Sequence, residues 1–495
     1  MIYLRRRYKI AIGVGAALVA VVALYFVLVG WNADVDEAVS SGKSTKILGR
    51  VDLNREDLLR SKKMQKAEAG ESFITYIRSP ENGDIAVKVV MPSESRYPEG
   101  APVVVDVSNF FTPVNGFHEG VDATEIGAIS VYYLWPGKED PKTRAKSDGE
   151  FDYGGPNSLA ALRDVIRFAL DLEPNIEGRY FHELTEITPL KHNVGLYAFS
   201  HPGIVGTNVI ALHGKEIPSL KYFVGRENPT VDEMYPLEIG YYTDERKIMV
   251  NPFYNPSGYS TSSVQVDYST VGWVINKEYP EGRPYFKNVP KEEGPQLNPE
   301  PVQDFVLSEK GPTLFGKKYY SAALTRALAD NGALNEGNWP AHLATPEEAE
   351  RNWPYRTTVN NYSLLKNSAP NLKVMLVFAM NDHVLAAPDK PHIHHAYDGF
   401  KKGAGLWTRL NPDLSYVEKI AEKDQGKPLK EGGSAFTDNI ANTEPVDWLK
   451  AYEWGYQAPY AGRVGTQLVP LAALAEMMDR TRANNWAPNL EGVLN

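Results

Sequence analysis

The chain has 495 residues, of which 43% are hydrophobic and 23% are charged. At about 150 residues per domain, this length allows two to four domains and a large core. The sequence has no cysteine, which excludes disulfides, cysteine-based zinc sites, iron–sulfur clusters and a cysteine nucleophile. The net charge of −10 argues against nucleic-acid binding, which needs a basic surface, and we expect no nucleic-acid partner.

The N-terminal segment differs sharply from the rest of the chain. Arg5, Arg6, Arg7 and Lys9 precede an uncharged run of 22 residues from 10 to 31. As a helix this run would be about 33 Å long, enough to cross a bilayer core of about 30 Å. We therefore expect residues 1–31 to form a basic cytoplasmic tip and a single-pass membrane anchor. The acidic body would then lie outside the cytoplasm.

Two other interpretations of this segment are a cleaved signal peptide and a buried core helix. The apolar run is longer than the usual signal-peptide core of about 7–15 residues, and no small-residue cleavage motif follows it. These features favour a retained anchor. Residues 32–70 are polar and charged, and we expect them to form a stalk.

From residue 72 onward the pattern becomes strand-like. Residues 73–77 and 85–91 flank a turn at Pro80–Asp84 and predict a β-hairpin. The short β-branched run at 102–107 is typical of a strand buried on both faces of a parallel sheet. Strands and helices then alternate. The expected strands are 128–134, 194–199, 220–224, 374–379 and 406–410, and the expected helices are 159–172, 204–212 and 392–401.

This order predicts an α/β fold with a mostly parallel sheet and helices on both faces. The 159–172 helix would be capped by Asn157 or Ser158. The stretch from 226 to 370 is too long for a loop in a compact domain, so we expect it to form an inserted cap subdomain. It contains β-like residues at 258–276 and predicted helices at 318–329, 346–352 and 357–366.

The expected division of the body follows from this insertion. Residues 71–225 and 371–445 would form the two parts of the core, and 446–495 a helical extension with an amphipathic helix at 468–481. Tyrosine and tryptophan are numerous in the body. We expect most of them to pack in cores and loops, and an aromatic face for a sugar or a protein partner is the alternative.

The most informative motif follows the predicted strand 194–199. Ser200 comes directly after this strand, and a helix begins within two residues. A nucleophile on such a sharp turn stands clear of the sheet, and the N-terminus of the helix stabilises developing negative charge. The segment Ala198-Phe199-Ser200-His201-Pro202-Gly203 resembles the nucleophile turn of the α/β-hydrolases, G-x-S-x-G.

The order of the predicted elements also resembles that family over residues 70–225 and 370–415. The resemblance implies an α/β-hydrolase-like core with a large inserted cap. Pro202 departs from the motif. Proline suits the first turn of a helix, but it also biases His201 toward an extended conformation.

The resemblance implies further site residues. Asp382 follows the 374–379 strand, where the family has its triad acid, and Glu227 or Asp232 would occupy the variant position after the preceding strand. The His201 N–H would be one oxyanion donor, and the Phe110 N–H, from the loop after the 102–107 strand, would be the other.

The general base is the weakest part of this pattern. The family's histidine follows the last strand, but no histidine occurs after His395. We take His383 as the base, with His392, His394 and His201 as alternatives. The run His392-Ile393-His394-His395 splits its imidazoles between helix faces, so we read it as ordinary histidines rather than a metal site. We expect no metal and no cofactor.

The resulting prediction is a membrane-anchored extracytoplasmic protein resembling a serine hydrolase. It would attack an ester or an amide of a small molecule or peptide through an acyl-enzyme on Ser200. The alternative is a catalytically inactive protein of the same fold that serves as a binding or structural subunit at the cell surface. The missing histidine after the last strand favours the alternative, because a serine is much weakened without its base.

Overall fold

The computed structural model describes residues 45–47, 66–109, 115–230, 234–243, 247–255, 266–287, 304–308, 313–378, 391–425, 468–487, 490 and 493. By contacts the chain divides into two units, Met1–Thr45 and Lys46–Asn495. The predicted anchor and nearly all of the predicted stalk lie outside the described residues. Within the described part of the chain, no helix has the length and apolar character needed to cross a membrane.

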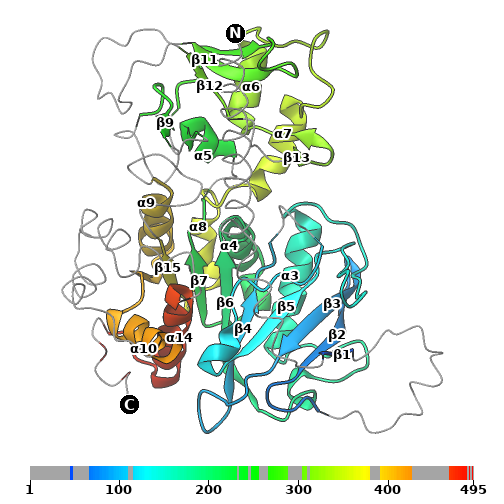
Figure 1. Cartoon of the computed structure of the whole chain (residues 1–495), viewed down its shortest axis with the longest axis vertical. Coiled ribbons are helices and arrows are strands. Elements are labelled where there is room, and N and C mark those ends of the chain that lie inside the picture. The colour runs from blue at the N-terminus through cyan, green and yellow to red at the C-terminus, as the bar shows by residue number, and fades with distance from the viewer. Residues whose placement is uncertain are drawn as a thin grey trace, which may run out of the picture. The chain divides into compact units, whose positions relative to one another are not determined.

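The centre of the second unit is a nine-stranded sheet in the order β1-β2-β3-β5-β4-β6-β7-β15-β16 (Figure 1). The hairpin β2–β3 is antiparallel, and β3 pairs antiparallel with β5. Six strands of this sheet, β5, β4, β6, β7, β15 and β16, are parallel to one another. The strands are β1 (Thr45–Ile47), β2 (Ser72–Ser79), β3 (Gly83–Val90), β4 (Ala101–Asp106), β5 (Ile129–Tyr133), β6 (Pro189–Phe199), β7 (Tyr222–Arg226), β15 (Lys373–Val377) and β16 (Trp407–Leu410).

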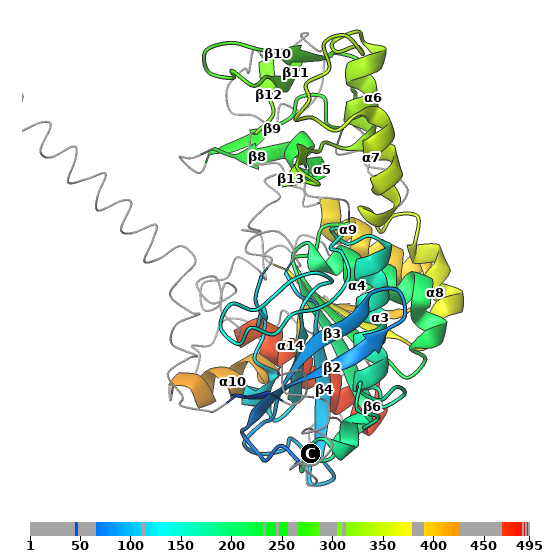
Figure 2. The same ribbon diagram turned by 90° about the vertical axis from the view of Figure 1, so that its right-hand side faces the viewer.

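Helices cover both faces of this sheet, as the sequence predicts. Figure 2 shows α3, α4 and α8 on one side and α10 and α14 on the other. The described α-helices in this part of the chain, α9 included, are α3 (Pro156–Ala169), α4 (Pro202–His213), α8 (Tyr362–Ser368), α9 (Pro391–Asp398), α10 (Leu414–Gln425) and α14 (Leu468–Ala483). A π-helical turn at Gly399–Gly403 follows α9, and short 3-10 turns lie at Ala123–Ile126, Phe181–Glu183, Gly214–Glu216 and Trp353–Tyr355.

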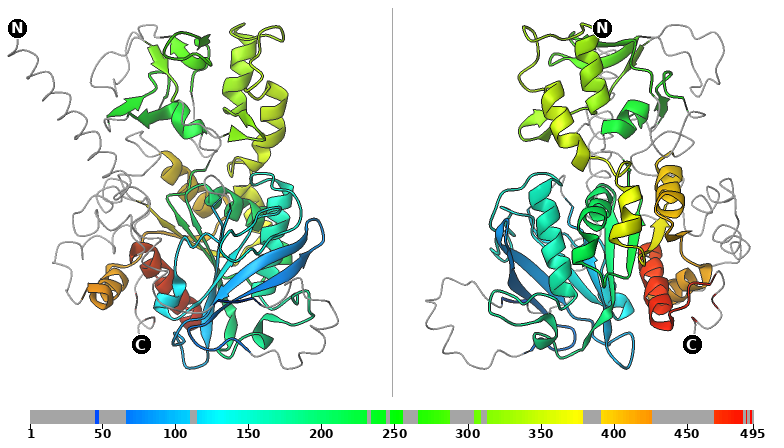
Figure 3. Two further views of the ribbon diagram at one scale, coloured as in Figure 1. Left: turned by 45° about the vertical axis from the view of Figure 1, so that its right-hand side comes forward. Right: turned by 180° about the vertical axis from the view of Figure 1, so that it is seen from behind.

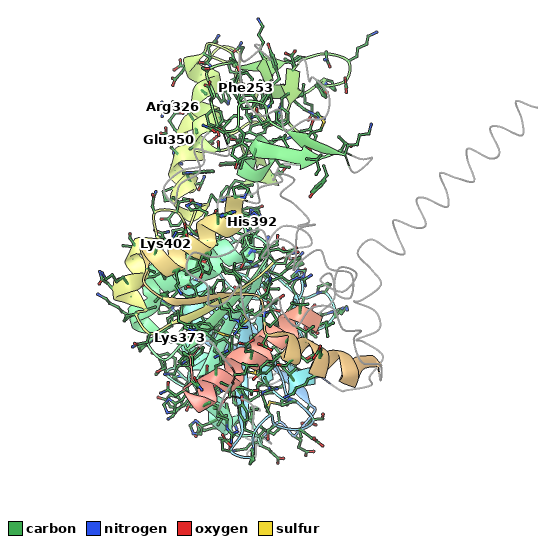
Figure 4. The ribbon with its side chains drawn as sticks, turned by 90° about the vertical axis from the view of Figure 1, so that its left-hand side faces the viewer. Phe253, Arg326, Glu350, Lys373, His392 and Lys402 are labelled. Carbon is green, nitrogen blue, oxygen red and sulfur yellow. The ribbon has the colours of Figure 1, made fainter. Side chains whose placement is uncertain are left out.

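The region between β7 and β15 forms its own small core. Phe253, Phe286 and Leu324 are among its buried residues, and they bring a three-stranded antiparallel sheet against a helix (Figure 3). The elements here are α5 (Met234–Ile239), β8 (Gly240–Tyr242), β9 (Ile248–Val250), β10 (Val271–Val274), β11 (Arg283–Lys287), β12 (Asp304–Val306), β13 (Thr313–Leu314), β14 (Lys317–Lys318), α6 (Ala322–Asp330) and α7 (Pro346–Asn352). The helices α6 and α7 are joined by the ion pair Arg326–Glu350, labelled in Figure 4.

Two local predictions are wrong. The helix α3 begins at Pro156 after the N-cap Gly155, so neither Asn157 nor Ser158 is its cap. Instead, the carboxylate of Asp152 accepts the backbone N–H groups of both residues at 2.6 and 3.1 Å. Proline fits this first position because its missing N–H would have no partner within the helix.

The helix α14 is not amphipathic. Its residues from 468 to 478 are all buried, including Glu476, and Arg480 is buried as well. The buried charged residues that make the segment look amphipathic, Glu476 and Arg480, form ion pairs in the core. Arg480 Nε donates to Glu476 Oε1 at 2.8 Å, and Arg409 Nη1 from β16 donates to the same oxygen at 3.0 Å.

Candidate active site

Ser200 lies at the carboxyl end of β6, in the middle of the sheet between β4 and β7. Its φ is +61°, a left-handed conformation that is unfavourable for any residue with a Cβ. The strand ends at Phe199 and α4 begins at Pro202, so the chain reverses within two residues. The structure thus confirms the predicted sharp turn at Ser200 and shows that it is strained, and we call Ala198–Gly203 the serine turn.

The prediction that Pro202 biases His201 toward an extended conformation is wrong. His201 has φ −53° and ψ −40°, which is helical, and Pro202 is the first residue of α4. The Gly203 N–H donates to Ser200 O at 2.9 Å and the Ile204 N–H donates to His201 O at 2.9 Å. These bonds compensate for the steric bias that the following proline imposes.

The neighbouring strand fixes the serine turn from one side. The Ser200 N–H donates to the carbonyl of Arg226, the last residue of β7, at 2.8 Å. The guanidinium of Arg226 lies 4.4 Å from the centre of the Phe199 ring, and Arg226 is buried. Phe199 and Arg226 are register partners, so both side chains lie on the same face of the sheet.

Glu227 follows β7 directly and is also left-handed, with φ +45°. It is buried, and its N–H donates to Val377 O at the end of β15 at 2.8 Å. Two adjacent strands therefore end in strained residues, one a serine and the other an acid. Strain of this kind persists where the surroundings hold it, and it gathers at functional sites. Asp232 lies outside the described residues.

The buried carboxyl of Asp106 lies at the end of β4, one strand from Ser200. Asp106 is the register partner of Tyr197, and its Oδ2 accepts the Val121 N–H at 3.0 Å. Burial raises the pKa of this carboxyl well above its usual range, and the N–H groups of Val121 and Gly120 oppose this only in part. Burial also raises the pKa of Tyr197.

Asp106 closes the loop that leads from β4 toward Val121. The Ser108 hydroxyl donates to Tyr133 O at 2.7 Å, and the Trp135 Nε1–H donates to Asn109 O at 3.0 Å. These two bonds fix the start of the loop to β5 and to the residues just after it, and the Val121 N–H bond to Asp106 fixes its far end to β4. Phe110, the predicted second oxyanion donor, lies outside the described residues.

The predicted acid and base, Asp382 and His383, also lie outside the described residues, which resume at Pro391 with α9. Figure 4 shows His392 on this helix. His395 is fully buried, and its Nδ1 lies 3.0 Å from Thr230 Oγ1 in the loop after β7. Burial lowers the pKa of His394 to about 4, so its imidazole is neutral at pH 7.

The last strand, β16, is followed by Asn411, which is left-handed with φ +59°. The Phe378 N–H donates to Asn411 Oδ1 at 3.0 Å, and the Asn411 N–H donates to Leu376 O at 2.8 Å. Asn411 therefore ties the ends of β15 and β16 together at the position where the family resemblance implies a histidine. No group of three or more potential metal ligands gathers among the residues that the structure describes.

No protein-family model matches the chain, and no curated protein does. Solved structures do match it, at low identity. A dipeptidyl peptidase 4 from Porphyromonas gingivalis has 9% identity and a TM-score of 0.32, with 69% of this chain and 31% of the peptidase covered. The chain thus spans about a third of that protein.

A thermostable esterase from Pseudomonas putida has 12% identity and a TM-score of 0.32, covering 69% of this chain and 72% of the esterase. A carboxyl esterase 2 from Tuber melanosporum has 13% identity and a TM-score of 0.32, covering 76% and 84%. The fold assignment itself rests on the strand order and on the strained turn at Ser200. Together these features are those of an α/β-hydrolase-like fold.

Proposed function

We propose that this chain, with its α/β-hydrolase-like fold, is a serine hydrolase that cleaves an ester or an amide through an acyl-enzyme on Ser200. The observation that carries the proposal is the left-handed Ser200 between β6 and the N-terminus of α4. A serine in an ordinary turn has no need of this strain. A nucleophile does, because the turn lifts its Oγ clear of the sheet.

In this mechanism the Ser200 Oγ attacks the carbonyl carbon of the substrate, and its proton passes to a histidine. The His201 N–H, at the start of α4, donates to the resulting oxyanion, and the dipole of α4 adds to this stabilisation. The Phe110 N–H is the proposed second donor. The oxyanion then collapses, the alcohol or amine leaves with the proton, and water hydrolyses the acyl-enzyme by the same steps.

We propose His383 as the base and Asp382 as the acid that orients it. Glu227 is the competing acid, and its burial and strain at the end of β7 support it. Alanine variants of His383, His392, His394 and His201 would identify the base, and Asp382→Asn and Glu227→Gln would identify the acid. Substitution of the true base or acid should lower kcat by about 10³–10⁴-fold, with little change in KM.

The test of the activity is labelling of the purified full-length protein by a fluorophosphonate, which reacts with activated serines. We expect labelling of the wild type, its complete loss in Ser200→Ala, and no change in the matched variant Ser93→Ala, which removes an exposed hydroxyl. A folded wild type that neither takes up the probe nor hydrolyses aryl esters and peptide anilides would overturn the proposal.

The second candidate is an inactive protein of this fold that binds a partner at the cell surface. The observation in its favour is Asn411 after β16, where the family resemblance implies the histidine. In that case Ser200→Ala would leave the function in cells intact, and a stoichiometric partner would be recovered with either form in mild detergent.

We also propose that residues 10–31 anchor the protein in a membrane with its body outside the cytoplasm. The uncharged run and its basic flank support this. Because the chain has no cysteine, single cysteines can report on each side. In intact cells a membrane-impermeant maleimide should label Ser93→Cys and spare Tyr3→Cys. Labelling of both or of neither would contradict this orientation.

A further inference from the structure

The side chain of Asn228 lies against the serine turn. Asn228 comes two residues after the end of β7 and is buried. Its amide nitrogen lies 2.8 Å from Ser200 O, 3.0 Å from Ala198 O and 3.0 Å from Arg226 O. One side chain thus donates to backbone carbonyls on both strands that meet at the turn.

Two glycines make room for this side chain. A Cβ at Gly203, in the first turn of α4, would lie 2.1 Å from Asn228 Cγ. A Cβ at Gly225, in β7, would lie 2.1 Å from Asn228 Oδ1. Since real Cβ contacts do not come under 3.0 Å, any other residue at either position would displace Asn228. The space that Asn228 fills therefore depends on a glycine in α4 and a glycine in β7.

Asn228 and Arg226 hold Ser200 by its two backbone polar groups. The Ser200 N–H donates to Arg226 O, and Ser200 O accepts from the Asn228 amide. A left-handed serine costs about 1–3 kcal/mol and persists only where its surroundings determine its geometry. The Gly203 N–H also donates to Ser200 O, but it belongs to the helix that the turn must enter, and so it does not fix the strand side.

We infer that Asn228 is a positioning residue for the nucleophile, and this inference rests on the proposed hydrolase function. By holding the carbonyls of Ala198 and Ser200, the amide keeps the turn left-handed, so that the Ser200 Oγ and the His201 N–H face the substrate carbonyl together. Asn228 acts through the backbone and does not touch the substrate. A displacement of about 1 Å at such a site lowers the rate by about 100-fold.

The test is the isosteric variant Asn228→Asp. It keeps the shape of the side chain, but a carboxylate oxygen, which only accepts hydrogen bonds, then faces the backbone carbonyls in place of the amide N–H donor. The matched control is Asn193→Asp, because Asn193 is also buried, lies on β6, and donates to a single distant carbonyl, Met478 O, at 2.9 Å. At pH 7.5 we expect Asn228→Asp to lower the maximal rate of fluorophosphonate labelling by about 100-fold. The probe concentration at half-maximal rate should change little, and Asn193→Asp should keep the wild-type rate.

A second readout separates positioning from a loss of folding. Protonation gives the carboxyl introduced by Asn228→Asp one O–H donor, which can replace part of the lost amide. The labelling rate of this variant relative to the wild type should therefore rise as the pH falls from 7.5 to 5.5. Equal rates in variant and wild type, or a loss that stays constant with pH, would overturn the inference.

Hydrogen exchange distinguishes failure of the inference from failure of the proposed function. The amide protons of Ser200, His201 and Gly203 should exchange faster in Asn228→Asp than in the wild type at pH 7.5, while those of β4 stay protected. If the wild type takes up no probe, the hydrolase proposal fails, and exchange alone then decides whether Asn228 holds the turn. Unchanged exchange would show that it does not.

Discussion

Two regions of the core that contain buried polar groups hold them in different ways. At the serine turn, Asn228 and Asp106 bond to the backbone, and Ser200 and Glu227 are strained. At α14, Arg409, Glu476 and Arg480 bond to one another, and no member of this cluster has a positive φ.

The difference shows what each arrangement can do. Charges that pair with each other attach the helix α14 to the strand β16. Arg409 and Glu476, which form one of these pairs, are 67 residues apart in the sequence. Side chains that bond to the backbone, such as Asn228 and Asp106, instead fix the dihedral angles of the chain. Only the second arrangement fixes the backbone around Ser200, the proposed nucleophile, so variants in the two regions should separate activity from stability.

The largest expected effect on activity is that of Ser200→Ala. It should abolish fluorophosphonate labelling while the midpoint of thermal unfolding stays within about 2 °C of the wild type, because the turn is held through the backbone groups of Ser200, which alanine keeps. Labelling and calorimetry of the same preparation check both. Residual labelling at another residue would contradict Ser200 as the nucleophile.

The largest expected effect on stability is that of Glu476→Ala. It leaves two buried guanidinium groups with less compensation and should lower the free energy of unfolding by about 3–5 kcal/mol. Denaturant titration followed by tryptophan fluorescence measures this loss. At a temperature where the variant is folded, its labelling rate should equal that of the wild type, and a specific loss of labelling would show that the two regions are not independent.

The variant Gly203→Ala should affect both quantities. Its Cβ would displace Asn228, and overpacking of this kind costs about 1–3 kcal/mol. We also expect slower labelling, because the displaced amide releases Ser200 O. Gly332→Ala is the matched control for folding, as a Cβ there meets no atom within 4 Å, although its φ of +67° adds strain. Wild-type labelling in Gly203→Ala would contradict this link.

Asp106→Asn should change the pH dependence of stability. Burial raises the pKa of Asp106 in the folded state. The contribution of the protonated carboxyl to the free energy of unfolding is therefore fully present below the unfolded pKa of about 3.9, and it is lost as the pH rises toward the folded pKa. Asparagine cannot ionise. The free energy of unfolding of the variant, relative to that of the wild type, should therefore increase from pH 4 to pH 8, by at most about 1.4 kcal/mol per pH unit. Denaturant titrations across this range measure the difference, and a difference that is flat with pH would show that Asp106 is ionised at no cost.

Ser200→Gly should have a small effect on stability, and its sign is opposite to that of the other substitutions at the serine turn. Glycine adopts a left-handed conformation without strain, so the variant should be more stable than the wild type by about 1 kcal/mol, with no labelling. Chemical denaturation of Ser200→Gly and Ser200→Ala in parallel measures the strain relieved, less the entropy of about 0.4–1 kcal/mol that glycine adds to the unfolded chain. A Ser200→Gly variant less stable than Ser200→Ala would contradict a strained turn.

The sequence alone determined the order and type of the core elements. Burial selects local sequence patterns, such as the hydrophobic runs 102–107 and 194–199 and the helix pattern between them. The structure confirms two strands and a helix in these segments. The serine turn was also readable, because a strand followed by serine and a proline-initiated helix is a local signal. The prediction that α14 is amphipathic was wrong, because the spacing of polar and apolar residues does not show that Glu476 is buried in ion pairs with arginines.

Only the tertiary structure decided how the turn is held. Asn228 is separated from Ser200 by a helix and a strand, and it reaches Ser200 because β6 and β7 are parallel neighbours. Nothing in the sequence around Asn228 distinguishes it from an ordinary loop residue. Glu227 was one of two open alternatives for the acid, and its burial and positive φ appear only in the fold. Local patterns fix secondary structure, whereas the geometry of a site depends on side chains that the fold brings together from distant segments.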